Sequence, residues 1–394
     1  MPTSAQFSFG FDFSQTGPYY GPGSNAKAVA SALRVLSGVP GMLEDTSIMD
    51  WGLPDPEPSP GTFNLAPLAA RISLITSAGG TPVITLCTAP NWMKDGTGPD
   101  VAPTPAHYQD FAALAAKIAQ TFPQVKYFVV WNELKGFWNP AIGGWDISQY
   151  TDMYNDVYAA IKRVRPDALV GGPYAVTLPS ATPQPGTLAS TPHGAWGYLS
   201  QPVLDTIAYW LAHNAGAQFV AVDGPDFPSS GPITDPLAAT DKYAAADQWL
   251  REHTSLPIWW MESRIQPDDS GWTASQAAAI RVAALVQFAS SGARAGLEWQ
   301  PQQDGELPDE GLWTATQYTG GGQPTVLARL LPAVLAVLRD RVAVVPGQRS
   351  GILVARGQAG TIAVNTTTGT GTALIDGTSV TLGPGQVRVI PAPG

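Results

Sequence analysis

The feature that most constrains the fold of this chain is an alternation of two kinds of segment along its first 340 residues. Short runs rich in β-branched and aromatic residues alternate with longer amphipathic stretches rich in Ala and Leu, an order typical of parallel βα architecture. The eight expected strands are FSFGFDF from Phe7, LRVLSG from Leu33, PVITLC from Pro82, YFVVWNE from Tyr127, LVGGPY from Leu169, FVAVDG from Phe219, IWWMES from Ile258 and GLEWQ from Gly296.

The segments between these runs carry apolar residues at three- and four-residue spacing, which predicts helices. Examples are HYQDFAALAAKIAQTF, SQYTDMYNDVYAAIKRVR, TDKYAAADQWLREH and SQAAAIRVAALVQFAS. Ser148, Thr240 and Thr273 stand where a side chain can cap a first turn. Eight such units predict a (β/α)8 TIM barrel over residues 1–340. The alternative, a doubly wound open sheet, is disfavoured because no Gly-rich phosphate loop follows the first strand.

The composition changes in residues 341–394, where short Val, Ile and Thr runs are separated by Gly-containing turns. This pattern predicts a small antiparallel β domain, sandwich-like in form. A segment of about 55 residues buries little core by itself, so we expect it to pack on the barrel.

Charge and composition narrow the classes of partner. The chain has a net charge of -10, with 44% hydrophobic and 13% charged residues, so we expect a soluble globular protein whose scarce Lys and Arg do not grip nucleic acid or anionic lipid. Cys87 is the single cysteine, and the four His show no metal-ligand spacing, so we predict no metal and no cofactor. We also expect no membrane helix and no signal peptide in the sequence as given; compartment and oligomeric state stay open.

Two acids end expected strands. Glu133 closes the fourth in VVWNELKGFW, and Glu262 closes the seventh in IWWMESR. Residues at the carboxyl ends of barrel strands meet at one mouth, where these two carboxyls would face each other. Glycosidic bond hydrolysis requires such a pair, one as proton donor and one as anion. The other interpretation is that both are polar rim residues without chemistry.

The W-N-E of VVWNELKGFW, followed by an aromatic pair, resembles the acid/base motif of clan A glycoside hydrolases and is closest to glycoside hydrolase family 39, which includes β-xylosidases and α-L-iduronidases. The resemblance extends through LRVLSG, TAPNWM and both strand-end acids. It implies that Glu133 is the general acid/base and Glu262 the nucleophile. It also implies that Asn132 hydrogen-bonds the sugar's 2-hydroxyl and that Arg34 supports the anionic nucleophile.

The sequence departs from this family after the sixth strand, where many members place a His and a Tyr. Here VAVDGPDFP offers Asp223, which either binds a sugar hydroxyl or caps a turn. Arg34 likewise either supports the nucleophile or pairs with a structural acid. The eighth strand supplies Glu298 and Trp299 as candidate substrate contacts, and in related enzymes a Trp at this place forms a platform under the sugar ring.

Tryptophans near the expected strand ends favour carbohydrate binding, because the C–H face of a sugar ring packs on an indole. The candidates are Trp92, Trp138, Trp145, Trp272, Trp299 and Trp313. We predict substrate contact for Trp92, Trp138 and Trp299, with a core position as the alternative for each.

These observations predict a retaining glycosidase that acts on a neutral oligo- or polysaccharide, with its two carboxyls about 5 Å apart. A carbohydrate-binding pseudoenzyme is a second hypothesis, against which the presence of both Glu133 and Glu262 argues. A transglycosylase on the same barrel is a third, and the sequence does not separate it from a hydrolase.

Overall fold

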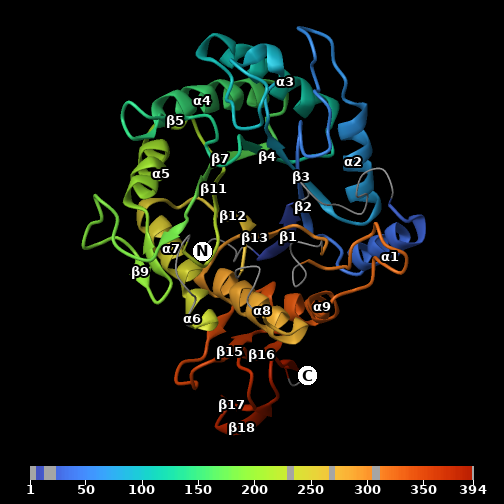
Figure 1. The fold of residues 1–394 in the computed structure, drawn as a ribbon, viewed down its shortest axis with the longest axis vertical. Helices are drawn as coiled ribbons and strands as arrows, with labels where there is room; N and C mark the ends of the chain where they lie inside the picture. Colours follow the sequence, from blue (N-terminus) through green and yellow to red (C-terminus); the bar gives the residue numbers. More distant parts are fainter. Residues whose placement is uncertain (1–5, 13–23, 229–234, 266–270, 304–310, 393–394) are drawn as a thin grey trace.

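The structure is a computed structural model that describes residues 6–12, 24–228, 235–265, 271–303 and 311–392 (Figure 1). Eight parallel strands close into a barrel, in the order in which they follow along the chain, with the last pairing with the first. This confirms the predicted fold class. The barrel strands are β1 (Ser8–Asp12), β2 (Leu43–Ser47), β3 (Thr81–Leu86), β4 (Tyr127–Val130), β7 (Leu169–Val176), β11 (Phe219–Asp223), β12 (Ile258–Ser263) and β13 (Ala295–Trp299).

Helices surround this ring of strands (Figure 1). They are α1 (Ala26–Ser37), α2 (Ala66–Ser77), α3 (Tyr108–Thr121), α4 (Ile147–Val164), α5 (Gln201–His213), α6 (Pro236–Ala239), α7 (Asp241–His253), α8 (Ala274–Ser291) and α9 (Val326–Leu338). Thr273 caps α8 in a reciprocal capping box with Gln276, as its position predicts. Asp146, rather than Ser148, caps α4, and Thr240 precedes α7 without a side-chain cap bond.

Side-chain alternation along the strands separates two apolar layers. Leu43, Val83, Val129, Phe219 and Leu297 are among the residues that fill the barrel interior, so the barrel is a packed core. Alternate strand residues pack outward against the helices. On β2 and β11 the inward side chains change from apolar to polar, since Asp45 comes two positions after Leu43 and Asp223 two positions after Ala221, so these carboxyl groups lie at the mouth.

One predicted strand is wrong. LRVLSG lies in α1, whose buried residues Ala28, Val29, Ala32 and Leu36 form one helical face and whose first turn is capped by Asn25. The second strand is instead LEDTS of β2, which is buried throughout although most of its residues are polar.

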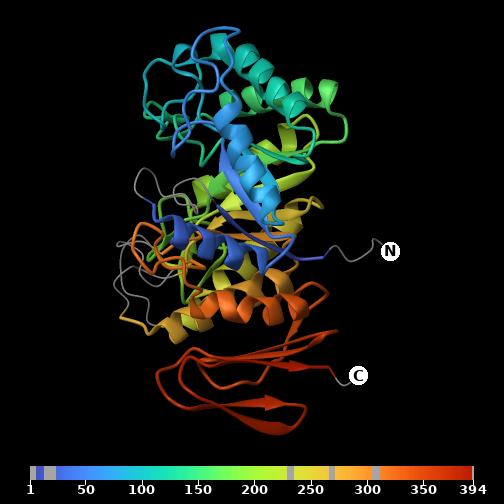
Figure 2. The same cartoon turned by 90° about the vertical axis from the view of Figure 1, so that its right-hand side faces the viewer.

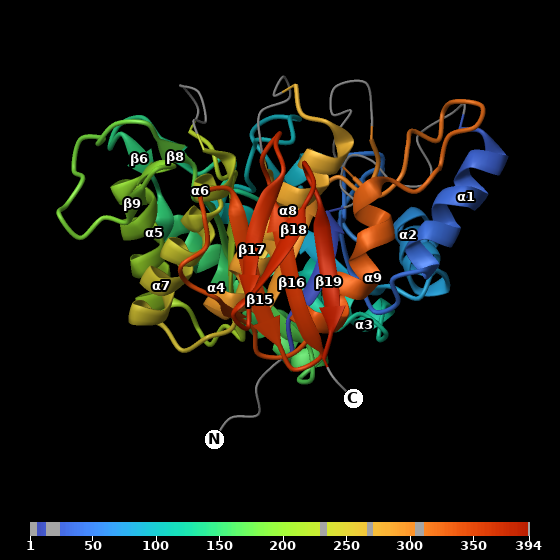
Figure 3. The same ribbon diagram turned by 90° about the horizontal axis from the view of Figure 1, so that it is seen from below.

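The C-terminal residues form two small antiparallel sheets, which confirms the predicted β domain. One contains β14 (Ala343–Val344), β15 (Ile352–Gly357), β16 (Gly360–Asn365) and β19 (Val387–Pro391), and the other contains β17 (Gly371–Ile375) and β18 (Thr378–Leu382). The four-stranded sheet packs against α8 and α9, and the β17–β18 hairpin packs on its other side (Figures 2 and 3).

Short strands and 3-10 turns lie in the loops of the barrel. They are the hairpin of β5 (Trp138–Asn139) and β6 (Gly144–Trp145), the sheet of β8 (Pro179–Ser180), β9 (His193–Gly194) and β10 (Gly197–Leu199), and the 3-10 turns η1 (Asn91–Met93) and η2 (Pro105–His107). Within the described ranges, the helices are too short or too polar to cross a membrane.

Candidate active site

Glu133 lies in a tight turn directly after β4. Trp131, Glu133 and Leu134 have φ angles of 69°, 50° and 55°, a left-handed region that non-glycine residues adopt at some energetic cost. Hydrogen bonds hold the turn: the Trp131 indole N–H donates to the Lys135 carbonyl at 2.7 Å, and the Lys135 amide donates to the Asn132 carbonyl at 3.1 Å. This turn directs the Glu133 carboxyl toward two acids on β11 and β12, which lie beyond β7 in the barrel.

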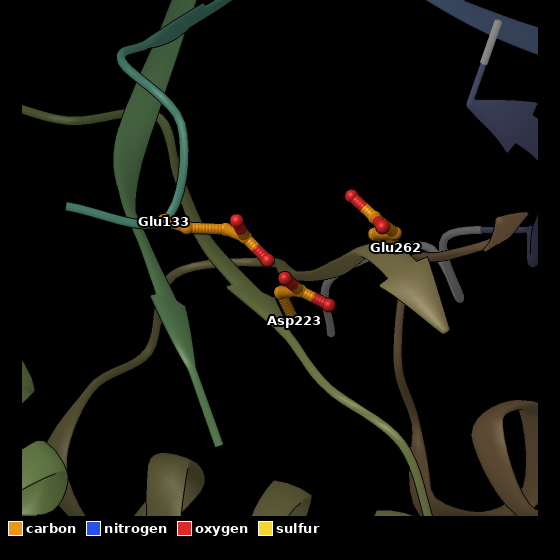
Figure 4. A group of neighbouring side chains, drawn as sticks. All are labelled: Glu133, Asp223 and Glu262. Atoms are coloured by element: carbon orange, nitrogen blue, oxygen red, sulfur yellow. The ribbon is translucent and has the colours of Figure 1, made fainter. Parts of the chain in front are cut away.

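Three carboxyl groups meet at the mouth (Figure 4). They belong to Glu133, to Asp223 at the end of β11 and to Glu262 in β12, and one oxygen of each lies within 4.8 Å of the others. The Asp223 and Glu133 side chains share a hydrogen bond. Burial, followed by Asp12 and Glu133, raises the pKa of Glu262 well above its ordinary value. Such crowding favours a site that keeps at least one proton among its acids.

Lys135 supplies positive charge to this cluster. Its Nζ lies 2.6 Å from Glu133 Oε2 and 5.3 Å from the centre of the Trp51 ring. The ammonium also lowers the pKa of Glu262, although burial outweighs it. Lys135 was not among the predicted site residues, although it stands two positions after Glu133 in VVWNELKGFW.

Tyr174 is a second site residue that was not predicted from the sequence. Its hydroxyl donates to Glu262 Oε2 at 3.2 Å, and this bond lowers the pKa of Glu262. Tyr174 is buried in β7 with a φ of 57°. Its signal was its place at the end of the LVGGPY run, since strand-end side chains can reach the mouth.

A further acidic pair lies on the first two strands. Asp12 and Asp45 are partners in the register of β1 and β2, and both are buried. The Thr85 hydroxyl donates to Asp45 Oδ2 at 2.7 Å, while burial and then Asp12 raise the pKa of Asp45 well above its ordinary value. Arg71 reaches the same strands, where its Nη1 lies 3.4 Å from Thr46 Oγ1. Asp45 was not predicted because the second strand was expected at LRVLSG rather than at LEDTS.

Two predicted substrate contacts lie beside the acids. Asn132 precedes Glu133 and is 8% exposed, and its Oδ1 has no hydrogen-bond partner within the described part of the chain. Trp299 ends β13 and pairs in register with Asp12. The Arg264 guanidinium lies 5.0 Å from the centre of the Trp299 ring, so at most one face of that ring remains for a sugar.

Two other predicted tryptophans lie in loops around the mouth. Trp138 is 53% exposed on the β5–β6 hairpin, edge-on to Trp145 at 5.2 Å, and borders a hollow of about 440 Å³. Trp92 is half-buried in η1, where its indole N–H donates to the Glu57 carbonyl at 2.8 Å and its ring meets His107 edge-on.

Two predicted substrate contacts are wrong. Arg34 is exposed in the last turn of α1, beside Pro324 and Pro332 on the outer surface of the barrel, because its segment is a helix rather than a strand. Glu298 points outward from β13, and its Oε2 lies 3.8 Å from Arg281 Nε in α8. Strand alternation explains this position, since the preceding residue, Leu297, fills the barrel interior.

The described residues contain one group of acids whose oxygens lie close enough together to bind a metal ion. It consists of Glu133, Asp223 and Glu262. The Lys135 ammonium counts against a divalent cation there, because it already neutralises one of the three acids.

Comparison with known proteins supports the fold. No protein-family model matches the chain, and no curated protein matches it. Among solved structures, a monomeric β-xylosidase from Caulobacter crescentus CB15 is 16% identical with a TM-score of 0.61, over 95% of this chain and 74% of that one. A glycoside hydrolase family 39 enzyme from Xanthomonas axonopodis pv. citri is 16% identical with a TM-score of 0.56, over 91% and 71%. A conserved exported protein from Bacteroides fragilis is 12% identical with a TM-score of 0.69, over 98% and 97%. At these identities the likeness is one of fold.

Proposed function

We propose that this protein is a retaining glycoside hydrolase that cleaves a neutral oligo- or polysaccharide by double displacement. The observation that carries the proposal is the pair Glu133 and Glu262, with oxygens within 4.8 Å at the carboxyl ends of barrel strands. Retaining enzymes separate their carboxyls by about 5 Å, whereas inverting enzymes need about 6.5–9.5 Å to admit a water. The similar folds of a β-xylosidase and a family 39 enzyme add support.

The two acids then act in sequence. A Glu262 oxygen bonds to the anomeric carbon while the bond to the leaving oxygen breaks, and Glu133 gives that oxygen its proton. In the second step Glu133 removes a proton from water, whose oxygen bonds to the anomeric carbon and releases Glu262. The Tyr174 hydroxyl stabilises the anionic nucleophile, since it donates to Glu262.

The residues around the acids suit a sugar ring. The buried Oδ1 of Asn132 accepts a bond from a sugar hydroxyl, which relieves an otherwise unmet acceptor. Trp299 offers an indole face at the mouth, and we assign further sugar contact to Trp138 and Trp92, which lie in the loops that follow β4 and β3. The excess of carboxyls over cations at the mouth disfavours sugars that carry a carboxylate.

A screen of aryl glycosides of xylose, arabinose, glucose, galactose and fucose tests this proposal. We expect one or more to be hydrolysed, and we expect Glu262→Ala to abolish the activity. Glu133→Ala should retain activity on substrates whose leaving group needs no proton and should be rescued by azide. Glu252→Ala, an exposed position on α7, is the matched control.

Proton NMR of the first-formed sugar gives the stereochemical outcome. Retention of the anomer supports double displacement, whereas inversion contradicts it. Activity that persists in Glu262→Ala contradicts the assignment of the site. An added acceptor alcohol separates hydrolysis from transglycosylation, because only transfer yields an alkyl glycoside.

A further inference from the structure

The environment of Glu133 presents a chemical conflict. In the proposed function this carboxyl must hold a proton for the leaving oxygen. Its Oε2 lies 2.6 Å from the Lys135 Nζ, so the proton donor of the proposed reaction faces a cation. The geometry points to Asp223, which has a carboxyl oxygen within 4.8 Å of one from Glu133, as the group that keeps a proton available there.

Asp223 lies beside Glu133, and its backbone is hydrogen-bonded to Thr177. It is 4% exposed at the end of β11, and its carbonyl accepts hydrogen bonds from the Thr177 amide at 2.8 Å and the Thr177 hydroxyl at 2.6 Å. One of its carboxyl oxygens lies within 4.8 Å of one from Glu133, and a side-chain hydrogen bond with Glu133 contributes to its raised pKa. An ionised carboxyl is an acceptor only, so a hydrogen bond between two carboxyls requires that one of them carry a proton.

We propose that Asp223 is a positioning residue that shares one proton with Glu133. It thereby keeps a proton available to Glu133, the general acid, beside Lys135. This inference rests on the proposed function. Before reaction the pair holds one proton. In the first step the Asp223 O–H breaks as the Glu133 O–H forms, and Glu133 passes its proton to the leaving oxygen, so both carboxyls become anionic. In the second step Glu133 takes a proton from water, and the pair again holds one.

Several ionisable groups surround the pair and set its charge. They are Lys135 after β4, Tyr174 in β7, Asp226 after β11, Lys242 in α7, Glu262 in β12 and, beyond Glu262, Asp12 in β1. Burial, then Glu262 and Glu133, raises the pKa of Asp223 well above its ordinary value, which agrees with a protonated partner.

Lys242 is a second lysine near the pair. Its Nζ donates to the carbonyls of Gly224 at 3.1 Å and Pro225 at 2.6 Å, and burial lowers its pKa to about 7. Its ionisation does not depend on the leaving group of the substrate. Comparison of two leaving groups therefore separates its effect from that of Asp223.

The test is Asp223→Asn, with kcat/KM measured against pH for two glycosides of the sugar that the wild type hydrolyses. One carries a 2,4-dinitrophenyl group, which leaves without a proton, and the other an unactivated phenol. The Asn amide donates to the Glu133 carboxylate and supplies no shared proton. At pH 7 we expect a loss of about 100-fold on the phenol substrate and less than about threefold on the dinitrophenyl substrate, since general acid catalysis contributes about 100- to 10,000-fold.

The pH profile gives a readout that a merely structural role would not move. For the phenol substrate, the basic side of the profile should move down by about one pH unit or more in Asp223→Asn. Lys135→Met should move it upward, because the competing ammonium is removed. Asp152→Asn, at an exposed position on α4, removes a carboxyl far from the mouth and should leave the profile unchanged.

Equal losses on both substrates without movement of the profile would overturn the proposal and make Asp223 a binding residue for a sugar hydroxyl. Should Asp223→Asn not fold, Asp223→Ser is measured in the same assay with the same expected and opposing results. Failure of the proposed function would look different, as either an inactive wild type or an active Glu262→Ala protein.

Discussion

Glu44 is a buried acid away from the mouth, and its protonation in the folded state can be tested through the pH dependence of the free energy of unfolding. In β2, Leu43 and Asp45 face the barrel interior, so Glu44 points outward beneath α2, where it is 1% exposed. A Cβ on Gly80 would lie 2.3 Å from its Oε1, and its Oε2 has no hydrogen-bond partner within the described residues. Burial raises the pKa of Glu44 from 4.5 to about 8.

The sign of the effect on stability follows from linkage. Below pH 4.5 the carboxyl is protonated in both the folded and unfolded states, and folding carries no penalty. Between pH 4.5 and about 8 only the unfolded chain ionises it, so the free energy of unfolding falls as pH rises. The pKa difference of about 3.5 corresponds to about 5 kcal/mol as an upper value, at about 1.4 kcal/mol per pH unit.

We therefore expect Glu44→Gln to remove this slope. Its free energy of unfolding, minus that of the wild type, should rise by several kcal/mol between pH 5 and pH 8. Urea unfolding followed by tryptophan fluorescence measures both proteins, and comparison of slopes cancels any fixed cost of the new amide. Glu252→Gln is the exposed control. A difference that stays constant with pH would refute a protonated Glu44 in the folded state.

Three further predictions concern the platform, the C-terminal sheets and a buried ion pair. Trp299→Ala should raise KM by about tenfold through lost stacking, with an unchanged melting temperature in calorimetry; unchanged KM with lower stability would make it a core residue. Truncation after Asp340 should expose apolar surface of α8 and α9, lower the melting temperature and increase light scattering; melting like the full chain would show an independent appendage. Arg281→Met should cost about 3–5 kcal/mol in urea unfolding because a buried cation 3.8 Å from Glu298 is removed, and a cost under about 1 kcal/mol would contradict a buried pair.

The barrel was predictable because most strands are apolar runs that end in polar residues. The second strand was not, because LEDTS sends Asp45 and Ser47 toward the mouth and Glu44 beneath a helix, so it lacks the apolar run expected of a buried strand. The neighbouring LRVLSG is rich in Leu and Val, yet these residues contribute to the buried face of α1.

The candidate site was predictable where a residue's place along a strand determines its direction. Glu133 follows a strand end, and Glu262 reaches the mouth because the pairing register shifts between Trp260 and Ser263, although Met261 before it fills the interior. Glu298 was misassigned because one step along β13 reverses the side chain. Lys135 and Tyr174 required the folded arrangement, since a turn of left-handed residues and a separate strand bring them to the two acids.

The last prediction concerns Tyr174→Phe. The hydroxyl of Tyr174 donates to Glu262 Oε2 at 3.2 Å and favours its anionic form, the form that attacks the anomeric carbon. A hydrogen bond to a charged acceptor contributes about 1.5–3 kcal/mol, so we expect kcat/KM to fall by about 10- to 100-fold. Phe keeps the ring that packs in the barrel interior, and the fold should persist.

The pH profile of this variant distinguishes the role of Tyr174 from that of Asp223. Without the hydroxyl, the pKa of Glu262 rises further, so the nucleophile becomes anionic only at higher pH and the acidic side of the profile should move upward. The basic side should stay in place, because the proton shared by Glu133 and Asp223 is untouched. Tyr209→Phe, an exposed position on α5, is the control. Movement of the basic side instead would mean that Tyr174 acts on the proton donor, and the separation of roles between the two acids would be wrong.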